Sequence, residues 1–314
     1  MPPLPPPRIV SLIPSATEIV AALGLADCLV GRSHECDYPP SVVSLPICTE
    51  PKFDPEGTSA EIHDRVTDLL QSALSVYRVK TEVLEQLQPT HILTQAQCEV
   101  CAVSLGEVEQ AVDCLTHSQP QIISLQPNVL ADLWTDIEQV AAALGVESQP
   151  VIDFLQQRVE TCAQGSSLIA DRPRVACIEW IEPLMAAGNW IPELVELAGG
   201  RSLFGEVGQH SPWLQWEALT IANPDLIILM PCGFDLTRTT QEARSLPTHP
   251  EWANLSAVKT GQVYVTDGNQ YFNRPGTRLV DSLEILAEIL HPDRFNFGYE
   301  GSGWRRVREF KDPA

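Results

Sequence analysis

Four side chains of the kind that bind soft metal ions lie in two polar segments of the first part of the chain. His34 and Cys36 are two residues apart, and Cys98 and Cys101 form a C-x-x-C pair. Thiolates and imidazole are the ligands that zinc and related ions prefer. If the two segments meet, three sulfurs and one nitrogen satisfy a tetrahedral zinc ion.

The C-x-x-C pair has other interpretations, because the second half of a zinc motif is missing. Cys98 is expected near a helix N-terminus, where the positive end of the helix dipole lowers a thiol pKa. Three interpretations therefore stay open: a metal or metal-cofactor contact, a redox pair built on Cys98 and Cys101, and structural thiols beside a loop.

Aromatic and acidic residues follow a predicted strand in the second half. Glu179, Trp180 and Glu182 come first, and Asn189 and Trp190 end the same loop. Tryptophan is more often a core residue, but flat aromatic walls with a few carboxylates suit a large, ring-containing ligand. The other candidate ligand contacts lie in or beside the remaining loops after predicted strands: Ser15, Thr17, Glu35, Asp37, Tyr38, Gln97, Phe272, Asn273 and Arg274.

No common catalytic motif is present in the sequence. It has no G-x-S-x-G, no Walker A sequence and no G-x-G-x-x-G. No obvious nucleophile, base and oxyanion hole can be assembled from it. We therefore expect a binding protein rather than an enzyme.

These loops are positioned by strand–loop–helix units. A short apolar strand over Ile9–Ile13 is followed by Pro14 and by a helix that runs through Leu23, and the helix opens on a segment, Ser15–Glu18, that resembles a capping box. The same order recurs later, with a strand near residues 175–178 and a helix over 191–197.

A second repeat links residues 84–93 to residues 219–229. In each, a helix end is broken by proline and followed by a strand, and further strands at 121–125 and 262–266 follow in the same order. We therefore predict an α/β protein with two Rossmann-like lobes built on one plan. Because strands alternate with helices, the sheets should be mainly parallel, with ligands bound outside the carboxyl ends of the strands.

The chain is expected to divide into five regions. A long helical linker between the lobes should restrict hinge motion, because the linker has helical periodicity and no flexible Gly/Ser stretch. The regions are a proline-rich arm (1–7), an N-terminal α/β lobe (8–127), a helical linker region (128–170), a C-terminal α/β lobe with a closing helix (171–291) and an irregular tail (292–314).

Composition limits the partners and suggests a compartment. The 314 residues include 20 Lys plus Arg and 41 Asp plus Glu, so the net charge is 20 − 41 = −21. Such a polyanion should be repelled by nucleic acid and anionic lipid, and no apolar run approaches the ~18 residues of a membrane-spanning helix. The first residues do not resemble a secretory leader, and nine cysteines suit a reducing compartment better than a disulfide framework. We therefore expect a cytoplasmic protein.

Several stretches resemble one family. Arg8–Gly24 together with Cys36–Pro39 closely resembles the opening of vitamin B12-binding proteins, members of the class III (helical-backbone metal receptor) solute-binding proteins of ABC importers. The resemblance continues through 222–229 and 261–264 to 274–276, so it covers most of residues 8–291. It implies two α/β lobes joined by a long helix, with a corrinoid, haem or chelated metal in a cleft between the lobes.

The resemblance also implies a partner. Glu82 and Glu217 fall where the family carries two surface glutamates that dock onto arginines of an ABC permease. The set of His34, Cys36 and the C-x-x-C pair is foreign to the well-known B12 receptor, although it is similar to a subgroup labelled cobalamin-binding.

We therefore predict a non-catalytic binding protein for a cobalamin-like corrinoid, acting as a carrier, a sensor or an importer receptor. Its expected partners are a small-molecule ligand and, as the resemblance implies, an ABC permease, but neither nucleic acid nor the membrane interior. Two alternatives use the thiol cluster: a binding protein for zinc, another transition metal or a metal chelate, and a thiol redox or metal-transfer enzyme.

Overall fold

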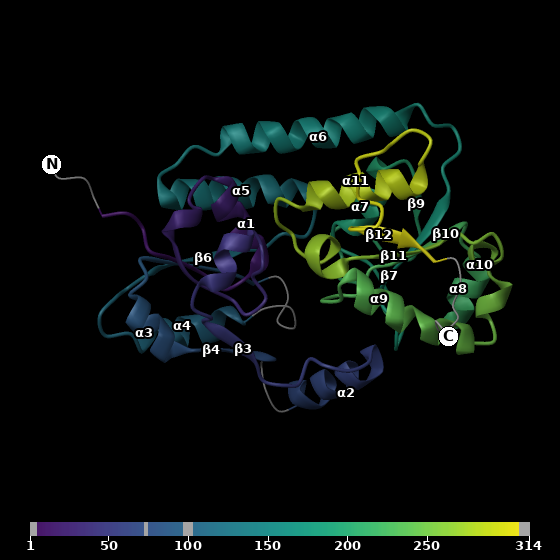
Figure 1. Ribbon diagram of the computed structural model, residues 1–314. Coiled ribbons are helices and arrows are strands. Elements are labelled where there is room, and N and C mark those ends of the chain that lie inside the picture. Colours follow the sequence, from purple (N-terminus) through teal and green to yellow (C-terminus); the bar gives the residue numbers. More distant parts are fainter. Residues whose placement is uncertain (1–4, 72–74, 97–102, 308–314) are drawn as a thin grey trace. The chain divides into compact units, whose positions relative to one another are not determined.

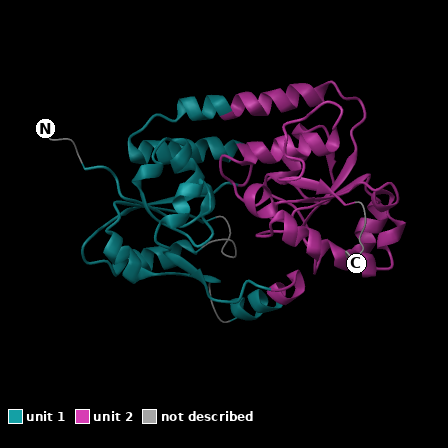
Figure 2. Ribbon diagram, in the orientation of Figure 1, with its two compact units in different colours: residues 1–56, 64–127, 131–154 teal, residues 57–63, 128–130, 155–314 magenta. Residues whose placement is uncertain are grey.

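The computed structural model describes residues 5–71, 75–96 and 103–307, and the chain divides into two compact units. Unit 1 comprises residues 1–56, 64–127 and 131–154, and unit 2 comprises residues 57–63, 128–130 and 155–314 (Figure 2). The boundary between the units passes through three helices: α2 (Ser59–Leu70), α6 (Gln149–Ser167) and, after its first residue, α5 (Leu130–Leu144).

Unit 1 is built on a four-stranded parallel sheet in the order β2-β1-β5-β6. In Figure 1, α1 and α5 lie on one side of this sheet, and α3 and α4 lie on the other. The strands are β1 (Ile9–Ser11), β2 (Leu29–Arg32), β5 (His91–Gln95) and β6 (Gln121–Leu125), with a separate antiparallel pair β3 (Thr49–Pro51) and β4 (Tyr77–Val79). The helices are α1 (Pro14–Ala22), α3 (Thr81–Leu87), α4 (Leu105–Asp113) and α5 (Leu130–Leu144), with 3₁₀ turns at Ala26–Cys28 and Pro40–Ser44.

Unit 2 is built on a mixed sheet in the order β12-β11-β10-β7-β8, with β9 paired to β7. Helices α7 and α11 lie on one side of it, and α8 and α9 lie on the other (Figure 1). The strands are β7 (Arg174–Trp180), β8 (Met185–Ala186), β9 (Arg201–Ser202), β10 (Leu226–Leu229), β11 (Val263–Thr266) and β12 (Trp304–Arg306). The helices are α7 (Ile191–Leu197), α8 (Trp216–Ala222), α9 (Leu236–Glu242), α10 (Ser256–Lys259) and α11 (Leu279–Leu290), with 3₁₀ turns at Ala243–Thr248 and Trp252–Asn254 and a π-helical turn, η5, at Gly268–Phe272.

The predicted α/β fold is confirmed, and the repeat is visible in both units. The parallel strands β1-β5-β6 of unit 1 have the same order as β7-β10-β11 of unit 2. Helices α3 and α8 end alike, at Gln88 (φ 46°) and Asn223 (φ 42°) in the left-handed region, before a proline and a strand. Leu84 and Leu219 occupy the same position in these helices, and each is buried in the core of its own unit.

The start of α1 differs from the predicted capping box. Pro14 is the first helical residue, and Ile13 precedes it in an extended conformation without a side-chain cap. Because proline has a fixed φ and no N–H, it fits the first helical position well. Ser15 and Glu18 are both buried, so neither is available as an exposed cap.

The end of the chain is also more ordered than predicted. Residues 304–306, expected to lie in an irregular tail, form β12, which pairs antiparallel with β11. The indole N–H of Trp304 donates to Glu288 of α11 over 2.9 Å, and the backbone N–H of Tyr299 donates to the same carboxylate over 3.2 Å. β12 therefore covers an edge of the sheet that would otherwise expose unpaired backbone groups.

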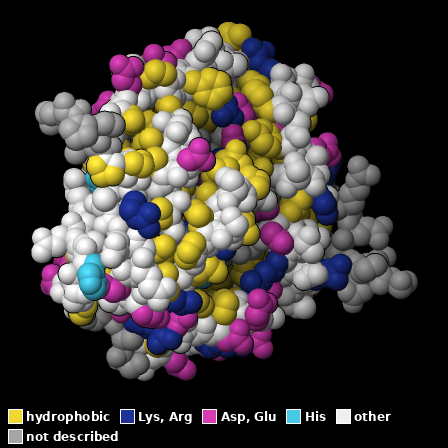
Figure 3. Space-filling model, turned by 60° about the vertical axis from the view of Figure 1, so that its left-hand side comes forward, with side chains coloured by type: hydrophobic (Ala, Val, Ile, Leu, Met, Phe, Trp, Pro, Cys, Tyr) yellow, Lys and Arg dark blue, Asp and Glu magenta, His cyan; other side chains and the backbone are white. Residues whose placement is uncertain are grey.

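Two observations concern hydropathy and surface charge. No helix in the described part of the chain is long and apolar enough to span a membrane. Acidic and basic side chains are interspersed on the face in Figure 3 rather than separated into two fields.

Candidate functional site

Three loops of unit 2 meet at Phe234. β7, β10 and β11 are adjacent and parallel, so the loops at their carboxyl ends share one edge of the sheet. The Phe234 ring, which follows β10, lies 5.4 Å (centroid to centroid) from the ring of Trp180, which ends β7. The Phe234 carbonyl accepts a hydrogen bond from the N–H of Asn269, after β11, over 3.0 Å. One residue therefore connects all three loops.

Backbone contacts hold this edge together. The N–H of Cys232 donates to the carbonyl of Glu179 over 3.1 Å, which joins the loops after β10 and β7. Gly268, after β11, approaches so closely that a Cβ there would lie 2.3 Å from the carbonyl oxygen of Pro231. Only glycine fits at this position.

A carboxylate lies beside the aromatic pair. Glu179 is half-buried, and its Oε2 accepts a hydrogen bond from the hydroxyl of Ser211 over 2.6 Å. The same hydroxyl accepts from the N–H of Gly188 over 3.0 Å. A Cβ on Gly188 would lie 2.5 Å from the carbonyl oxygen of Gln209, so this loop packs tightly against residues 209–211.

Trp180 and Trp190 differ in exposure. Trp180 is half-buried, whereas Trp190 is 5% exposed and donates its indole N–H to the carbonyl of Phe272 over 2.9 Å. Phe272 itself has no exposed surface. Both rings therefore lie in the core and offer little open surface, and the ligand contacts predicted for Trp190 and Phe272 stay predictions.

Glu182 and Asn189 lie in the same loop as Trp180. Glu182 is exposed, and its Oε2 lies 3.5 Å from Nε2 of His249. Asn189 is half-buried and adopts a left-handed conformation, with φ 51°. Both side chains keep some open surface, so their proposed contact with a ligand stays a prediction.

The loop after β11 is held mainly by its own polar residues. Asp267 is 3% exposed and accepts from the backbone N–H of Gln270 over 2.7 Å, and burial raises the pKa of its carboxyl. The amide of Asn273 donates to the carbonyl of Met230 over 3.0 Å. Arg274, 6% exposed, donates to Asn269 over 2.9 Å. Asn273 and Arg274, predicted as ligand contacts, are thus engaged in fixing the loop.

In unit 1, the predicted residues Ser15 and Thr17 are buried at the start of α1. Thr17 has no exposed surface, and its hydroxyl lies 2.8 Å from Oγ of Ser11 and 3.0 Å from Sγ of Cys36. Ser15 is 1% exposed, and its hydroxyl has no hydrogen-bond partner among the residues described. Both residues therefore have core positions, and the ligand contacts predicted for them stay predictions.

His34 is a neutral, partly buried imidazole. Its Nδ1 lies 2.8 Å from Oγ1 of Thr49. Burial, followed by the positive charges of Lys80 and Arg32, lowers the pKa of His34 to about 4. A proton on this ring is therefore strongly disfavoured at neutral pH.

The rest of this loop is more open. The carboxylate of Glu35 accepts from the hydroxyl of Tyr77 over 3.2 Å, whereas Asp37 is exposed and Tyr38 is 44% exposed. Their contact with a ligand stays a prediction. Asp37 and Tyr38 are the predicted contacts of unit 1 with the most accessible surface among those described.

Only two of the four residues of the predicted thiol cluster, His34 and Cys36, lie in the described part of the chain. Gln97, Cys98 and Cys101 lie outside the described residues. Among residues 5–71, 75–96 and 103–307, no group of three His, Cys, Asp or Glu side chains is placed to hold a metal ion. His34 and Cys36 instead contact threonines, so a zinc site is not shown, and the redox pair stays untested.

Glu82 and Glu217, the predicted docking residues, occupy equivalent exposed positions. Each is the second residue of its helix, α3 or α8, in the repeated helix–proline–strand segment.

Sequence reasoning missed Phe234 and Ser211. The position of Phe234 after an apolar strand was a usable signal, whereas Ser211 had none, because its partners lie 23 and 32 residues away.

The chain is similar to known proteins over most of its length. A family model described as "Periplasmic binding protein" matches residues 9–270. The vitamin B12-binding protein of Vibrio cholerae is 26% identical over 294 residues, which cover 92% of this chain and 90% of that protein. An uncharacterised ABC transporter substrate-binding lipoprotein of Bacillus subtilis, YvrC, is 24% identical over 302 residues, which cover 92% of this chain and 82% of the relative.

Solved structures share the fold. The periplasmic vitamin B12-binding protein of Vibrio cholerae superposes with a TM-score of 0.63 at 21% identity, covering 92% of this chain and 98% of the other. A periplasmic heme-binding protein of Pseudomonas aeruginosa superposes with a TM-score of 0.72 at 18% identity, covering 97% and 100%.

These relatives overturn the cytoplasmic location predicted from the sequence. They are named as periplasmic proteins or as a lipoprotein, so a place outside the cytoplasm is supported and the earlier prediction is wrong. That prediction rested on the first residues and on the cysteine count. The first residues do not constrain the compartment, because the match to the family begins only at residue 9. The cysteine count does not constrain it either, because a buried thiol behaves as a small apolar side chain. Cys48 is an example, since burial raises the pKa of its thiol to about 12.

Proposed function

Because the chain belongs to the periplasmic binding protein family, we propose that it is a non-catalytic receptor that binds a cobalamin-like corrinoid and delivers it to an ABC importer. The observation that carries the choice of ligand is the aromatic pair Trp180–Phe234 beside the carboxylate of Glu179. The similarity to the vitamin B12-binding protein of Vibrio cholerae supports the same ligand class.

The chemistry of a corrinoid suits this edge of unit 2. A corrinoid is a large, nearly flat ring system with amide side chains at its rim. Trp180 offers an aromatic face to such a ring, and half-buried Asn269, Gln270 and Glu179 offer donors and acceptors to amides. The overall charge of −21 is compatible with a ligand that carries little net charge.

The proposal is tested by titrating the full-length protein with cyanocobalamin and following absorbance and tryptophan fluorescence. Replacing Trp180 with alanine should weaken binding about 5- to 150-fold, or ~1–3 kcal/mol, with little change in the melting temperature. Trp180→Phe keeps an aromatic face and should retain most of the affinity. Trp190→Ala should instead lower stability by ~3–5 kcal/mol, because that ring is buried.

Haemin is the competing probe in the same titration. Saturable binding of cyanocobalamin that haemin does not displace supports the proposal. Binding of haemin alone, or a Trp180→Ala variant that binds cyanocobalamin as well as the wild type, would contradict it.

We also propose that Glu82 and Glu217 bind basic residues of the permease. Both carboxylates are exposed at the start of equivalent helices, one in each unit. In vesicles containing the permease, Glu82→Ala and Glu217→Ala should each reduce stimulation of ATP hydrolysis while leaving ligand affinity unchanged. Glu206→Ala, at another exposed glutamate of unit 2, is the matched control, and equal stimulation by all three variants would refute the proposal.

A further inference from the structure

Residues 57–63 come from the first half of the sequence but belong to unit 2 (Figure 2). They are hydrogen-bonded to α9. We call residues 57–63 the strap. The backbone N–H of Ser59 donates to Oε1 of Glu242 over 2.8 Å, and the Ser59 hydroxyl donates to the same oxygen. The carbonyl of Gly57 accepts from Nη2 of Arg238 over 2.9 Å. Two residues of α9 therefore hold the strap.

The contact with Glu242 has a clear physical basis. Ser59 is the first residue of α2 and has no exposed surface. The first N–H groups of a helix have no partner within the helix, and a carboxylate is favoured there by the helix dipole. The local cap, in which the N–H of Thr58 donates to Glu61 over 2.8 Å, leaves the N–H of Ser59 to Glu242. An acidic side chain 183 residues away thus completes the start of this helix.

The second contact leads from the strap to the aromatic pair. The guanidinium carbon of Arg238 lies 3.9 Å from the centroid of the Phe234 ring, a cation–π contact. The Phe234 ring in turn packs against Trp180. The backbone N–H of Arg238 is fixed by Asp235, which caps α9 over 2.7 Å. The side chain of Arg238 thus contacts both the strap, through the carbonyl of Gly57, and the ring of Phe234.

We infer that the strap is a positioning element of the ligand site: it holds Arg238 over Phe234 and thereby fixes the ring of Trp180. Glu242 is the residue that keeps the strap in place, although it touches neither aromatic ring in the contacts described. This inference rests on the proposed function, because it assigns Trp180 to the ligand. If the aromatic rings are already ordered in the free protein, less conformational entropy is lost when the ligand binds. Affinity differences between variants of one site appear mostly in the dissociation rate.

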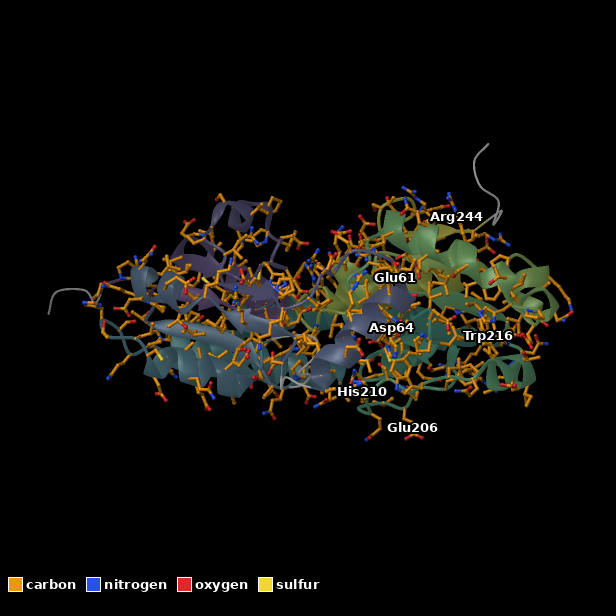
Figure 4. The ribbon with its side chains drawn as sticks, turned by 90° about the horizontal axis from the view of Figure 1, so that it is seen from below. Glu61, Asp64, Glu206, His210, Trp216 and Arg244 are labelled. Carbon is orange, nitrogen blue, oxygen red and sulfur yellow. The ribbon has the colours of Figure 1, made fainter. Side chains whose placement is uncertain are left out.

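The test uses four variants of the full-length protein. Glu242→Ala removes the acceptor for both Ser59 donors, and Glu242→Gln keeps a carbonyl oxygen in its place. Glu206→Ala removes an exposed glutamate of the same unit; Glu206 and Glu61 of the strap are labelled on separate segments in Figure 4. Ser59→Ala, which removes only the hydroxyl donor, is a milder fourth variant in case Glu242→Ala does not fold.

The first readout needs no ligand. Hydrogen exchange measured on peptides covering 57–63 and 231–238 should become faster in both segments in Glu242→Ala, while Glu242→Gln and Glu206→Ala should resemble the wild type. Faster exchange confined to 57–63 would overturn the inference, because the strap would then not be coupled to Phe234.

The second readout is the dissociation rate of cyanocobalamin, followed by stopped-flow dilution of the complex. Glu242→Ala should release it at least about fivefold faster at a temperature well below its melting midpoint. A lower midpoint with an unchanged dissociation rate would show a merely structural contact and would refute the inference. If the wild type binds no cyanocobalamin, the proposed function fails by itself, and the exchange experiment still decides whether the strap controls the Phe234 loop.

Discussion

Replacing Asp136 with asparagine should stabilise the protein at neutral and alkaline pH and have little effect in acid. Asp136 lies in α5 of unit 1 and is 4% exposed. Burial, and then the negative charge of Asp132, raise the pKa of the Asp136 carboxyl from 3.8 to about 7, against a smaller opposing effect of the backbone N–H of Gln126. The folded protein therefore holds this proton over a pH range in which the unfolded chain has lost it.

The sign and size of the effect follow from linkage. Below pH 3.8 the carboxyl is protonated in both the folded and the unfolded protein, so it does not lower the free energy of unfolding. As the pH rises from 3.8 to about 7, the unfolded chain releases the proton more readily, so the free energy of unfolding falls. The pKa of about 7 in the folded protein exceeds the value of 3.8 by about 3, which lowers the free energy of unfolding by on the order of 4 kcal/mol. This decrease is complete above pH 7. Asparagine has a similar shape and cannot ionise, so it avoids this loss.

Urea unfolding of the wild type and of Asp136→Asn at several pH values between 4 and 8.5 measures the effect. The difference between the two proteins should be small near pH 4, grow with pH and level off above pH 7. Asp113→Asn is the control, because Asp113 is an exposed aspartate at the end of α4 in the same unit, and its difference should stay within ~0.5 kcal/mol at every pH. A difference for Asp136→Asn that does not change with pH would refute the reasoning.

Three further changes have defined outcomes. The pKa of His34 is lowered from 6.5 to about 4, so its contribution to the free energy of unfolding is fully present above pH 6.5 and is lost as the pH falls toward 4. In urea unfolding at acid pH, the wild type should therefore lose up to about 3 kcal/mol that His34→Gln does not lose. Glu288→Ala should cost at least ~3 kcal/mol and speed hydrogen exchange of residues 297–304, because it leaves the indole N–H of Trp304 and several backbone N–H groups without an acceptor. Gly188→Ala should weaken cyanocobalamin binding in the titration described above, because its Cβ would lie 2.5 Å from the carbonyl oxygen of Gln209 and force the loop beside Glu179 to move; unchanged affinity would show that this loop does not shape the site.

The element pattern was largely readable from local sequence. The helix over 191–197 and the strand over 121–125 have the predicted bounds, and the repeated helix–proline–strand segment recurs with the same left-handed turn before Pro89 and Pro224. These features depend on periodicity, on proline and on neighbours within a few residues. The same local information identified the loops after strands as places for polar chemistry.

The surroundings of individual side chains were not readable in this way. Trp180 and Trp190 bracket one loop and look equivalent in the sequence, yet one is half-buried and the other is held in the core by the carbonyl of Phe272, 82 residues away. Phe234 acquires its place only when three strands adjacent in the sheet bring their loops together. Burial depends on what packs over a residue, and local periodicity does not contain that information.

The sequence by itself determined the α/β pattern, the internal repeat and the family to which the chain belongs, because these depend on local propensity and on motifs that lie within short segments. Only the tertiary structure decided that Glu242 holds the start of α2, that Asp136 is buried with a raised pKa, and that the last strand covers an edge of the sheet. Each of these rests on partners distant in sequence or on burial from solvent. Such contacts form when the chain closes long loops, and no short window of residues specifies them.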